Sequence, residues 1–364
     1  MRLIPKSRRG RIVLALGLVL VLAGGAGGLV ARWRHDPWPA RTIIDPGASV
    51  VLQGFAADGR SLLFRAVGQH QAWDVATGRP RPAGATSIVV PWAFARDGRS
   101  FAGQVDRSAV DWADVASGAI RARFPVAGVV LFLRFAADDR SIRAFVLDVK
   151  AGKTDLVTWD LATGDKSRLA LAWWPNWARP LACTPAGDLL IFGDPTEGLV
   201  AWDVATGRPL DRRLGSPGFA RDVNFAPVFT PDGRTLVIAG KDGRVEAWDV
   251  AAGRLDRAIA LPFRGMTPLA MTLSSDGRTL AASAATPPSG PPWSWVEVLV
   301  RRLNPAWARP IRTELVLVDL ATGRTLARSR GSSYAEFSPD GRTVVTAESD
   351  GTYAVRDAPT PPAR

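Results

Sequence analysis

One stretch of this chain, from Phe229 to Ile259, constrains the fold most, because it is the clearest copy of a repeated unit. Asp232-Gly233 and Asp242-Gly243 interrupt its short apolar runs, and Ala252-Gly253 follows the third run. Glycine tolerates the positive φ that a tight hairpin requires, so these pairs predict turns between antiparallel strands. We therefore expect each unit to be a meander of four short strands.

The second strand of this unit, Thr235 to Ala239, is almost entirely apolar. A strand with one face in water alternates polar and apolar residues, so a continuous apolar strand predicts a sheet packed on each side. A single unit cannot supply both neighbours, whereas successive copies of it can.

Seven copies of the unit are present. The turn after the first strand recurs at 58–60, 97–99, 138–140, 186–188, 232–234, 276–278 and 340–342. The third strand ends at an aspartate in every copy: Asp74, Asp114, Asp160, Asp203, Asp249, Asp319 and Asp357. These aspartates are 38 to 46 residues apart, except for 70 residues between the fifth and the sixth. Four-stranded units at this period predict an all-β fold, a seven-bladed β-propeller of antiparallel blades.

The repeats resemble those of the bacterial WD40-repeat family. The resemblance rests on Phe-Ser-Pro-Asp-Gly-Arg at 337–342 and Ala-Trp-Asp-Val-Ala-Thr-Gly at 201–207, and it covers roughly residues 42–358. It implies the propeller architecture and a role as a binding platform. Only four units keep Trp before the aspartate, and the chain has only His35 and His70. The buried Asp–His–Ser–Trp network of that family is therefore not expected here.

The two ends of the repeat array are complementary. The seventh unit stops after its third strand, Gly351 to Asp357, and no fourth strand follows. Arg41 to Ile44 lies just before the first strand of unit one, Ser49 to Ala56, where a fourth strand would stand. We expect this segment to complete the last sheet, which would close the ring and remove an open edge.

The N-terminal region contains a long apolar segment. Residues 12–30 carry no charge, and as a helix they would span about 28 Å, close to the thickness of the bilayer core. Five basic residues precede the segment, which places the N-terminus in the cytoplasm and the propeller on the exported side. Arg32 and Arg34 after it favour a transmembrane helix or uncleaved signal anchor over a signal peptide cleaved near Ala23 to Ala26. Cleavage would leave a secreted or periplasmic protein.

These features divide the chain into four parts. Residues 1–34 form a basic flank and the transmembrane helix, and 35–40 form a linker. The propeller spans 41–358, with an insertion at 286–313 in blade 6, and 359–364 form a disordered tail.

The net charge of +12 does not indicate nucleic-acid binding. Residues 1–34 carry seven basic residues and no acidic one, whereas the rest of the chain has 39 basic and 34 acidic residues. The propeller shows no basic cluster interleaved with aromatic residues, which a nucleic-acid surface would require.

Two connections are rich in tryptophan. One joins units three and four at 171–180, and the other is the insertion at 286–313. Strand direction alternates in a meander, so both connections emerge on the same face of the disc. The tryptophans concerned are Trp173, Trp174, Trp177, Trp293, Trp295 and Trp307. Tryptophan is enriched in interface hot spots, and one hypothesis is that this face docks a partner or touches the membrane. The alternative is that these side chains plug the ring or pack the insertion onto it.

The residues needed for several kinds of chemistry are missing. With one Cys, Cys183, and two distant His, neither a catalytic triad nor a metal site is expected, and no cofactor motif is present. The recurring turn aspartates are explained by hydrogen bonds to backbone N–H groups. His70 is expected on an exposed loop between two strands of unit one.

We therefore expect a membrane-anchored scaffold that is not an enzyme. Its expected partners are an unidentified protein and, through residues 12–30, the lipid bilayer, with no nucleic acid and no evident small-molecule substrate. Two alternatives remain. One is an exported propeller like those of quinoproteins or assembly lipoproteins, and the other is an enzyme with carboxylates in the central channel.

Overall fold

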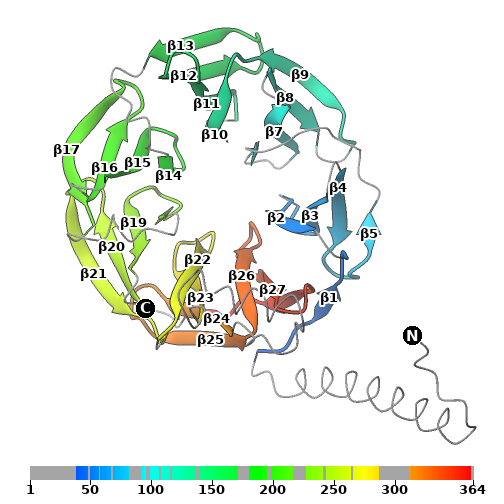
Figure 1. Cartoon of the computed structure of the whole chain (residues 1–364). Coiled ribbons are helices and arrows are strands. Elements are labelled where there is room, and N and C mark those ends of the chain that lie inside the picture. The colour runs from blue at the N-terminus through cyan, green and yellow to red at the C-terminus, as the bar shows by residue number, and fades with distance from the viewer. Residues whose placement is uncertain are drawn as a thin grey trace, which may run out of the picture.

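The computed structural model describes residues 38–361, except for several segments that interrupt this range. Those segments are 48–49, 57, 67–68, 82–91, 96–98, 106–107, 115–116, 137–138, 171–179, 195–197, 216–226, 241–242, 264 and 287–311. The described strands form seven four-stranded antiparallel sheets, arranged as the blades of a ring (Figure 1). The seven-bladed all-β propeller predicted from the sequence is therefore confirmed.

Each blade runs from an inner strand to an outer strand. Blade 1 contains β2 Val51–Phe55, β3 Ser61–Ala66, β4 Gln69–Asp74 and β5 Pro80–Arg81. Blade 2 contains β6 Trp92–Phe94, β7 Ser100–Val105, β8 Ala109–Asp114 and β9 Ile120–Pro125. Blade 3 contains β10 Val129–Phe135, β11 Ser141–Asp148, β12 Lys153–Asp160 and β13 Lys166–Ala170. Blade 4 contains β14 Pro180–Cys183, β15 Leu189–Asp194, β16 Gly198–Asp203 and β17 Arg208–Leu214.

The last three blades follow the same order. Blade 5 contains β18 Val228–Phe229, β19 Thr235–Ala239, β20 Arg244–Asp249 and β21 Arg254–Ala260. Blade 6 contains β22 Thr267–Leu273, β23 Thr279–Ala285, β24 Thr313–Asp319 and β25 Thr325–Arg330. Blade 7 contains β26 Ser332–Phe337, β27 Thr343–Glu348 and β28 Tyr353–Asp357, and its outer strand is β1 Thr42–Ile44 from the other end of the chain.

The second strands of blades 3 to 7 contribute to the cores on both of their sides. In β19, Leu236 and Ile238 belong to the apolar cluster shared with blade 4. Val237 and Ala239 belong to the cluster shared with blade 6. Because side chains alternate between the two faces of a strand, a continuous apolar run fills two interfaces at once. The ring thus has a core between neighbouring blades rather than one central core.

The turn residues act as the sequence predicts. Gly233 and Gly341 have φ values of 71° and 70°, and Asp139 takes φ 55° where most copies have Gly. The Asp74 carboxylate accepts hydrogen bonds from the backbone N–H of Ala76 and Thr77, at 3.0 and 2.8 Å. The Thr77 N–H, together with Arg81, lowers the pKa of Asp74 to about 2. The turn aspartates therefore have a structural role, as expected.

The N-terminal strand closes the ring, which confirms the expected complementarity of the two ends. Strand β1 pairs antiparallel with β28, with Thr42 opposite Val355 and Ile44 opposite Tyr353. The Trp38 indole Nε1 also donates to the Asp357 carbonyl at 2.8 Å. Ile44 is fully buried in the cluster that joins blades 7 and 1. We call this junction the seam.

A buried polar network lies next to the seam. Arg356 stands where four other blades carry Trp, and its Nη1 donates to Thr346 Oγ1 at 2.6 Å and to Glu348 Oε1 at 3.1 Å. Its Nε donates to the Trp38 carbonyl at 2.9 Å, and its guanidinium lies 5.3 Å from the centre of the Trp38 ring. The network ties the entering chain to blade 7 with a buried arginine at the position where four other blades have tryptophan.

The ring has two distinct faces. One side carries the turns between the first and second strands and between the third and fourth strands of each blade, and we call it the turn face. We call the loop face the side with the connections between second and third strands and between blades. The chain enters at the turn face, because Trp38 lies beside Asp357, the last residue of a third strand. The insertion leaves from the loop face, and at its base the Thr286 amide donates to the Arg312 carbonyl at 2.9 Å.

One expectation is wrong. His70 was expected on a loop, but the structure places its backbone inside β4, opposite Arg65. The strands β3 and β4 extend until only residues 67–68 separate them, which leaves no loop long enough to hold His70.

The proposed membrane helix lies outside the described residues, as do the first three residues of the linker and the final three of the chain. Within the part of the chain that the structure describes, no helix is long and apolar enough to cross a membrane.

The seam can be tested with two neighbouring isoleucines of β1. Replacing the buried Ile44 by Ala should lower the free energy of unfolding by about 2–5 kcal/mol, because it opens a cavity between blades 7 and 1. The same change at Ile43, which is 37% exposed, should cost less than about 1 kcal/mol. Urea unfolding followed by tryptophan fluorescence measures both. Equal effects at the two positions would contradict the seam.

Candidate binding site in the central channel

The inner strands of the blades place one equivalent residue each near the centre of the ring. This residue is the second-last of the strand. In blades 1 to 7 it is Gly54, Ala93, Arg134, Ala182, Val228, Thr272 and Glu336. Five of the seven are small or uncharged residues, so Arg134 and Glu336 are the exceptions. Both exceptions stand out when the seven copies are aligned at this strand position, whereas a comparison of what the copies share does not show them.

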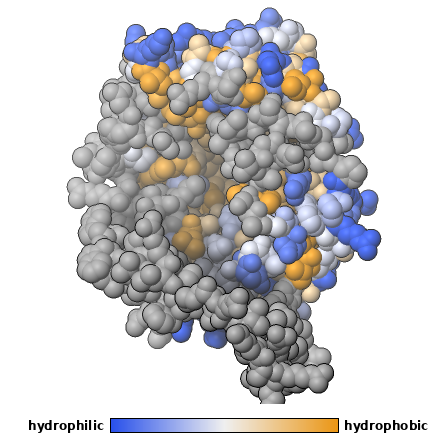
Figure 2. Space-filling model, turned by 45° about the vertical axis from the view of Figure 1, so that its right-hand side comes forward, coloured by the Kyte–Doolittle hydropathy of each residue, from blue (hydrophilic) through white to orange (hydrophobic). Residues whose placement is uncertain are grey.

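A cavity of about 590 Å³ opens in the channel between blades 2 and 6. Figure 2 shows the hollowed centre of the disc, with hydrophobic residues in its wall. The cavity is lined by Ala93, Phe132, Leu133, Arg134, Ala182, Cys183, Pro185, Pro227, Val228, Phe229, Pro231, Thr272, Leu273, Ser274 and Ser275. Pro185, Pro231 and Ser275 belong to first turns, so the cavity occupies the half of the channel next to the turn face.

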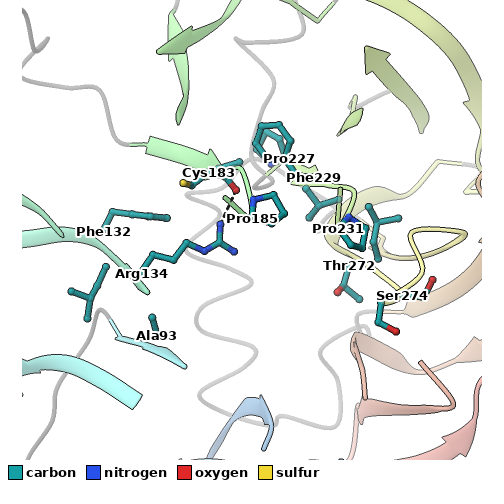
Figure 3. Close-up of a pocket in the computed structure, with 15 residues that line it drawn as sticks. Ala93, Phe132, Arg134, Cys183, Pro185, Pro227, Phe229, Pro231, Thr272 and Ser274 are labelled. Atoms are coloured by element: carbon teal, nitrogen blue, oxygen red, sulfur yellow. Dashed lines mark hydrogen bonds between the residues drawn. The ribbon is translucent and has the colours of Figure 1, made fainter. Parts of the chain in front are cut away.

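Arg134 carries the only charge among these lining residues. Its Nη1 donates to the backbone carbonyls of Cys183 and Thr184, at 2.8 and 3.1 Å. The side chain therefore reaches from blade 3 to the inner strand of blade 4 (Figure 3). Arg143, one strand further out, makes a similar bond to the Gly187 carbonyl at 2.9 Å. Arginines thus join these two blades at the turn face.

Cys183 lies in the cavity wall and is the single cysteine of the chain. Burial raises the pKa of its thiol above the ordinary value, and the nearby Arg134 guanidinium only partly opposes this shift. The sulfur therefore stays protonated at neutral pH, which is unfavourable for a nucleophile.

Glu336 is the other charged residue of the inner ring, and it does not line the cavity. The Tyr334 hydroxyl donates to Glu336 Oε2 at 2.6 Å, and Tyr334 packs against the core shared by blades 7 and 1. Burial raises the pKa of Glu336 to about 7, and the hydrogen bond from Tyr334 offsets only part of this effect. Burial and the Glu336 carboxylate also raise the pKa of Tyr334.

The enzyme alternative called for paired carboxylates in the channel. Among the described residues the cavity has no carboxylate in its wall, and Glu336 accepts a hydrogen bond from a tyrosine rather than lying against a second carboxylate. The described ranges also contain no group of three or more His, Cys, Asp or Glu residues that could hold a metal ion. The channel is open at this cavity.

The six tryptophans proposed for the partner-binding face lie outside the described residues. These are Trp173, Trp174, Trp177, Trp293, Trp295 and Trp307. The strand ends that flank them are described. Ala170 and Pro180 border the first segment, Ala285 and Thr313 border the insertion, and all four lie at the loop face.

The comparison with solved structures agrees with the fold. A similar structure is the β-propeller domain of Cps50 (Swd1) from Myceliophteria thermophila, with a TM-score of 0.62 and 16% identity. The match covers 88% of this chain and all of that one. No protein-family model and no curated protein matches the sequence. At this identity the likeness shows the fold alone, so the chain is a seven-bladed propeller similar to a WD40 propeller.

The raised pKa of Glu336 predicts a pH-dependent stability. A carboxyl with an ordinary pKa near 4.5 when unfolded and about 7 when folded makes the wild type lose stability as pH rises between these values. Replacing Glu336 by Gln should leave stability at pH 4.5 unchanged. Above pH 7 it should raise the free energy of unfolding by as much as about 3 kcal/mol. Chemical unfolding of both proteins across this range is the measurement, and parallel curves would contradict the burial of this carboxyl.

Proposed function

We propose that this chain is a membrane-anchored WD40-like β-propeller that acts as a scaffold for protein–protein interaction and has no catalysis of its own. The observation that carries the proposal is the asymmetry of the ring. The turn face consists of short turns capped by aspartates, whereas the loop face carries the long connections 171–179, 216–226 and 287–311. Long connections on a rigid scaffold are where propellers and other folds place binding residues.

The described residues add apolar surface to the loop face. Val149 in the turn between β11 and β12, Val51 at the start of β2 and Leu269 near the start of β22 are 63%, 51% and 42% exposed. The two tryptophan-rich segments begin and end at the same face. Aromatic and aliphatic side chains gathered in this way suit a protein partner, because such residues dominate interface energetics.

The position of Trp38 orients this scaffold relative to a membrane. Trp38 is buried at the turn face beside Asp357, and residues 31–37 connect it to the apolar segment 12–30. Seven residues reach at most about 25 Å when fully extended. A membrane helix at 12–30 would therefore hold the turn face near the bilayer and leave the loop face accessible to a partner. This favours a protein over the membrane surface as the target of the tryptophans.

The alternative proposal is an exported propeller released after cleavage within Ala23 to Ala26. Membranes are extracted with carbonate, and the intact mass of the tagged chain is measured in the soluble fraction and in the membrane pellet. This measurement distinguishes the two. A chain that retains residues 1–30 supports the anchor. A soluble chain that begins after Ala26 would contradict it.

The docking role of the loop face is tested with a double substitution, Trp293→Ser with Trp295→Ser. We expect it to remove most of the partners that crosslink to the wild type in native membranes and to leave the unfolding temperature unchanged. Losing two aromatic anchors should weaken binding by roughly 2 kcal/mol or more.

The matched control is Ile120→Ser with Leu255→Ser, which changes two exposed apolar side chains at the ends of outer strands on the turn face. This pair should keep the crosslinked partners. Unfolding or aggregation of the tryptophan variant would show instead that these residues pack the insertion onto the ring. Unchanged crosslinking would exclude them from the interface.

A further inference from the structure

The cavity in the channel has no part in the proposed scaffold role, since it lies toward the turn face and not the loop face. Most of the residues that line it are apolar, with Phe132, Phe229 and Leu273 among the larger ones, although polar atoms supply more of the exposed wall than apolar atoms do. It holds one charge, that of Arg134. A volume of about 590 Å³ lies within the usual range for pockets that hold small molecules.

The guanidinium of Arg134 is held in a fixed orientation. Its bonds to the Cys183 and Thr184 carbonyls both use Nη1. A guanidinium has five N–H donors in a planar fork, so Nε and Nη2 keep donors that have no oxygen acceptor among the described residues, with the Cys183 thiol as the other neighbour of the guanidinium. An arginine whose position is already fixed loses little further freedom when it binds an anion.

No acidic residue is among the described residues that line the cavity, and the neighbouring carboxylates of Asp188 and Asp276 accept hydrogen bonds from the Thr184 and Ser274 hydroxyls. The equivalent residues of the other blades around the cavity are Ala93, Ala182, Val228 and Thr272. Thr272 and Ser274 lie across the cavity from Arg134 (Figure 3). The Ser274 hydroxyl already bonds to Asp276, whereas the Thr272 hydroxyl has no hydrogen bond to another described residue. The site thus offers the Arg134 guanidinium, with two donors on one edge, at one side and the Thr272 hydroxyl at the other.

We propose that this cavity binds a small organic carboxylate with an apolar body. The carboxylate pairs with the free edge of the Arg134 guanidinium, since charge-assisted bidentate bonds are strong in a space partly shielded from water. The apolar body lies against Phe132, Phe229 and Leu273, and the Thr272 hydroxyl accepts or donates one further hydrogen bond. This inference does not rest on the scaffold role, and either can fail without the other.

Phenylbutyrate and its neutral amide, phenylbutyramide, form a matched pair of probes. Cys183 reports occupancy of the cavity, because it lines the wall and no other cysteine can react. The experiment measures the rate of Cys183 alkylation by N-ethylmaleimide in the full chain, held in nanodiscs at mildly alkaline pH, as each probe is titrated. Calorimetric titration of the same probes gives a second measurement that does not depend on the thiol.

We expect phenylbutyrate to protect Cys183 and to bind at least about tenfold more tightly than the amide. Replacing Arg134 by Gln should remove this preference. The control is Arg143→Gln, which loses a similar bond between blades 3 and 4 but does not line the cavity, and it should keep the preference. If Arg134→Gln fails to fold, Thr272→Glu replaces it as the test. Blade 7 already carries Glu at this strand position. The new carboxylate should form an ion pair with Arg134 and abolish phenylbutyrate binding.

Three results would overturn the proposal. The first is absence of protection and of measurable heat at millimolar phenylbutyrate. The second is equal binding of the carboxylate and the amide. The third is an unchanged preference in the Arg134→Gln or Thr272→Glu variant.

Discussion

Pairing between β1 and β28 is the interaction on which the rest of this structure depends. A meander of identical units has an exposed strand at each end, and an exposed edge invites further strands from other chains. Here three residues from the start of the propeller pair with the last strand, so blade 7 draws its strands from both ends of the chain. The three paired residues bury little surface by themselves, and the contacts around them supply most of the stability of the seam. Ile44 fills the core between blades 7 and 1, the Tyr353 hydroxyl donates to the Val50 carbonyl at 3.3 Å, and Arg356 holds the Trp38 carbonyl.

Closure of the ring also fixes where function can lie. The blades share their cores with their neighbours, so each blade is held on two sides and the ring resists local change. The connections on the loop face and the wall of the channel do not have to pack against a neighbouring blade, so their residues can vary. The proposed partner surface and the proposed carboxylate site therefore lie on different parts of the same scaffold. The single entry point at Trp38 orients both relative to any anchor that precedes it.

The fold was largely predictable from the sequence, and the reason is physical. Turn glycines, terminal aspartates and apolar second strands recur because every blade must meet the same geometric demands, so seven weak signals add to one clear prediction. Even the closing strand was predictable, because the seventh unit lacked a fourth strand. Asp139 shows the tolerance of the pattern, since an aspartate takes the positive φ that Gly takes in the other first turns that the structure describes. His70 was misplaced because the length of a short connection depends on how far each strand extends, which a repeat pattern does not determine.

The candidate site was not predicted, because it departs from the repeat. Arg134, Glu336 and Arg356 each stand where other blades have small, uncharged or aromatic residues, and a search for what the copies share overlooks them. The most direct test of the closed ring is hydrogen–deuterium exchange of the full chain, resolved to peptides that cover residues 41–44 and 353–357. The account predicts that the amides of 41–44 are protected along with those of 353–357, because the Arg41 amide donates to Val355 and β1 is the edge strand paired with β28. Rapid exchange of 41–44 beside slow exchange of 353–357 would show that the N-terminal strand does not close the propeller.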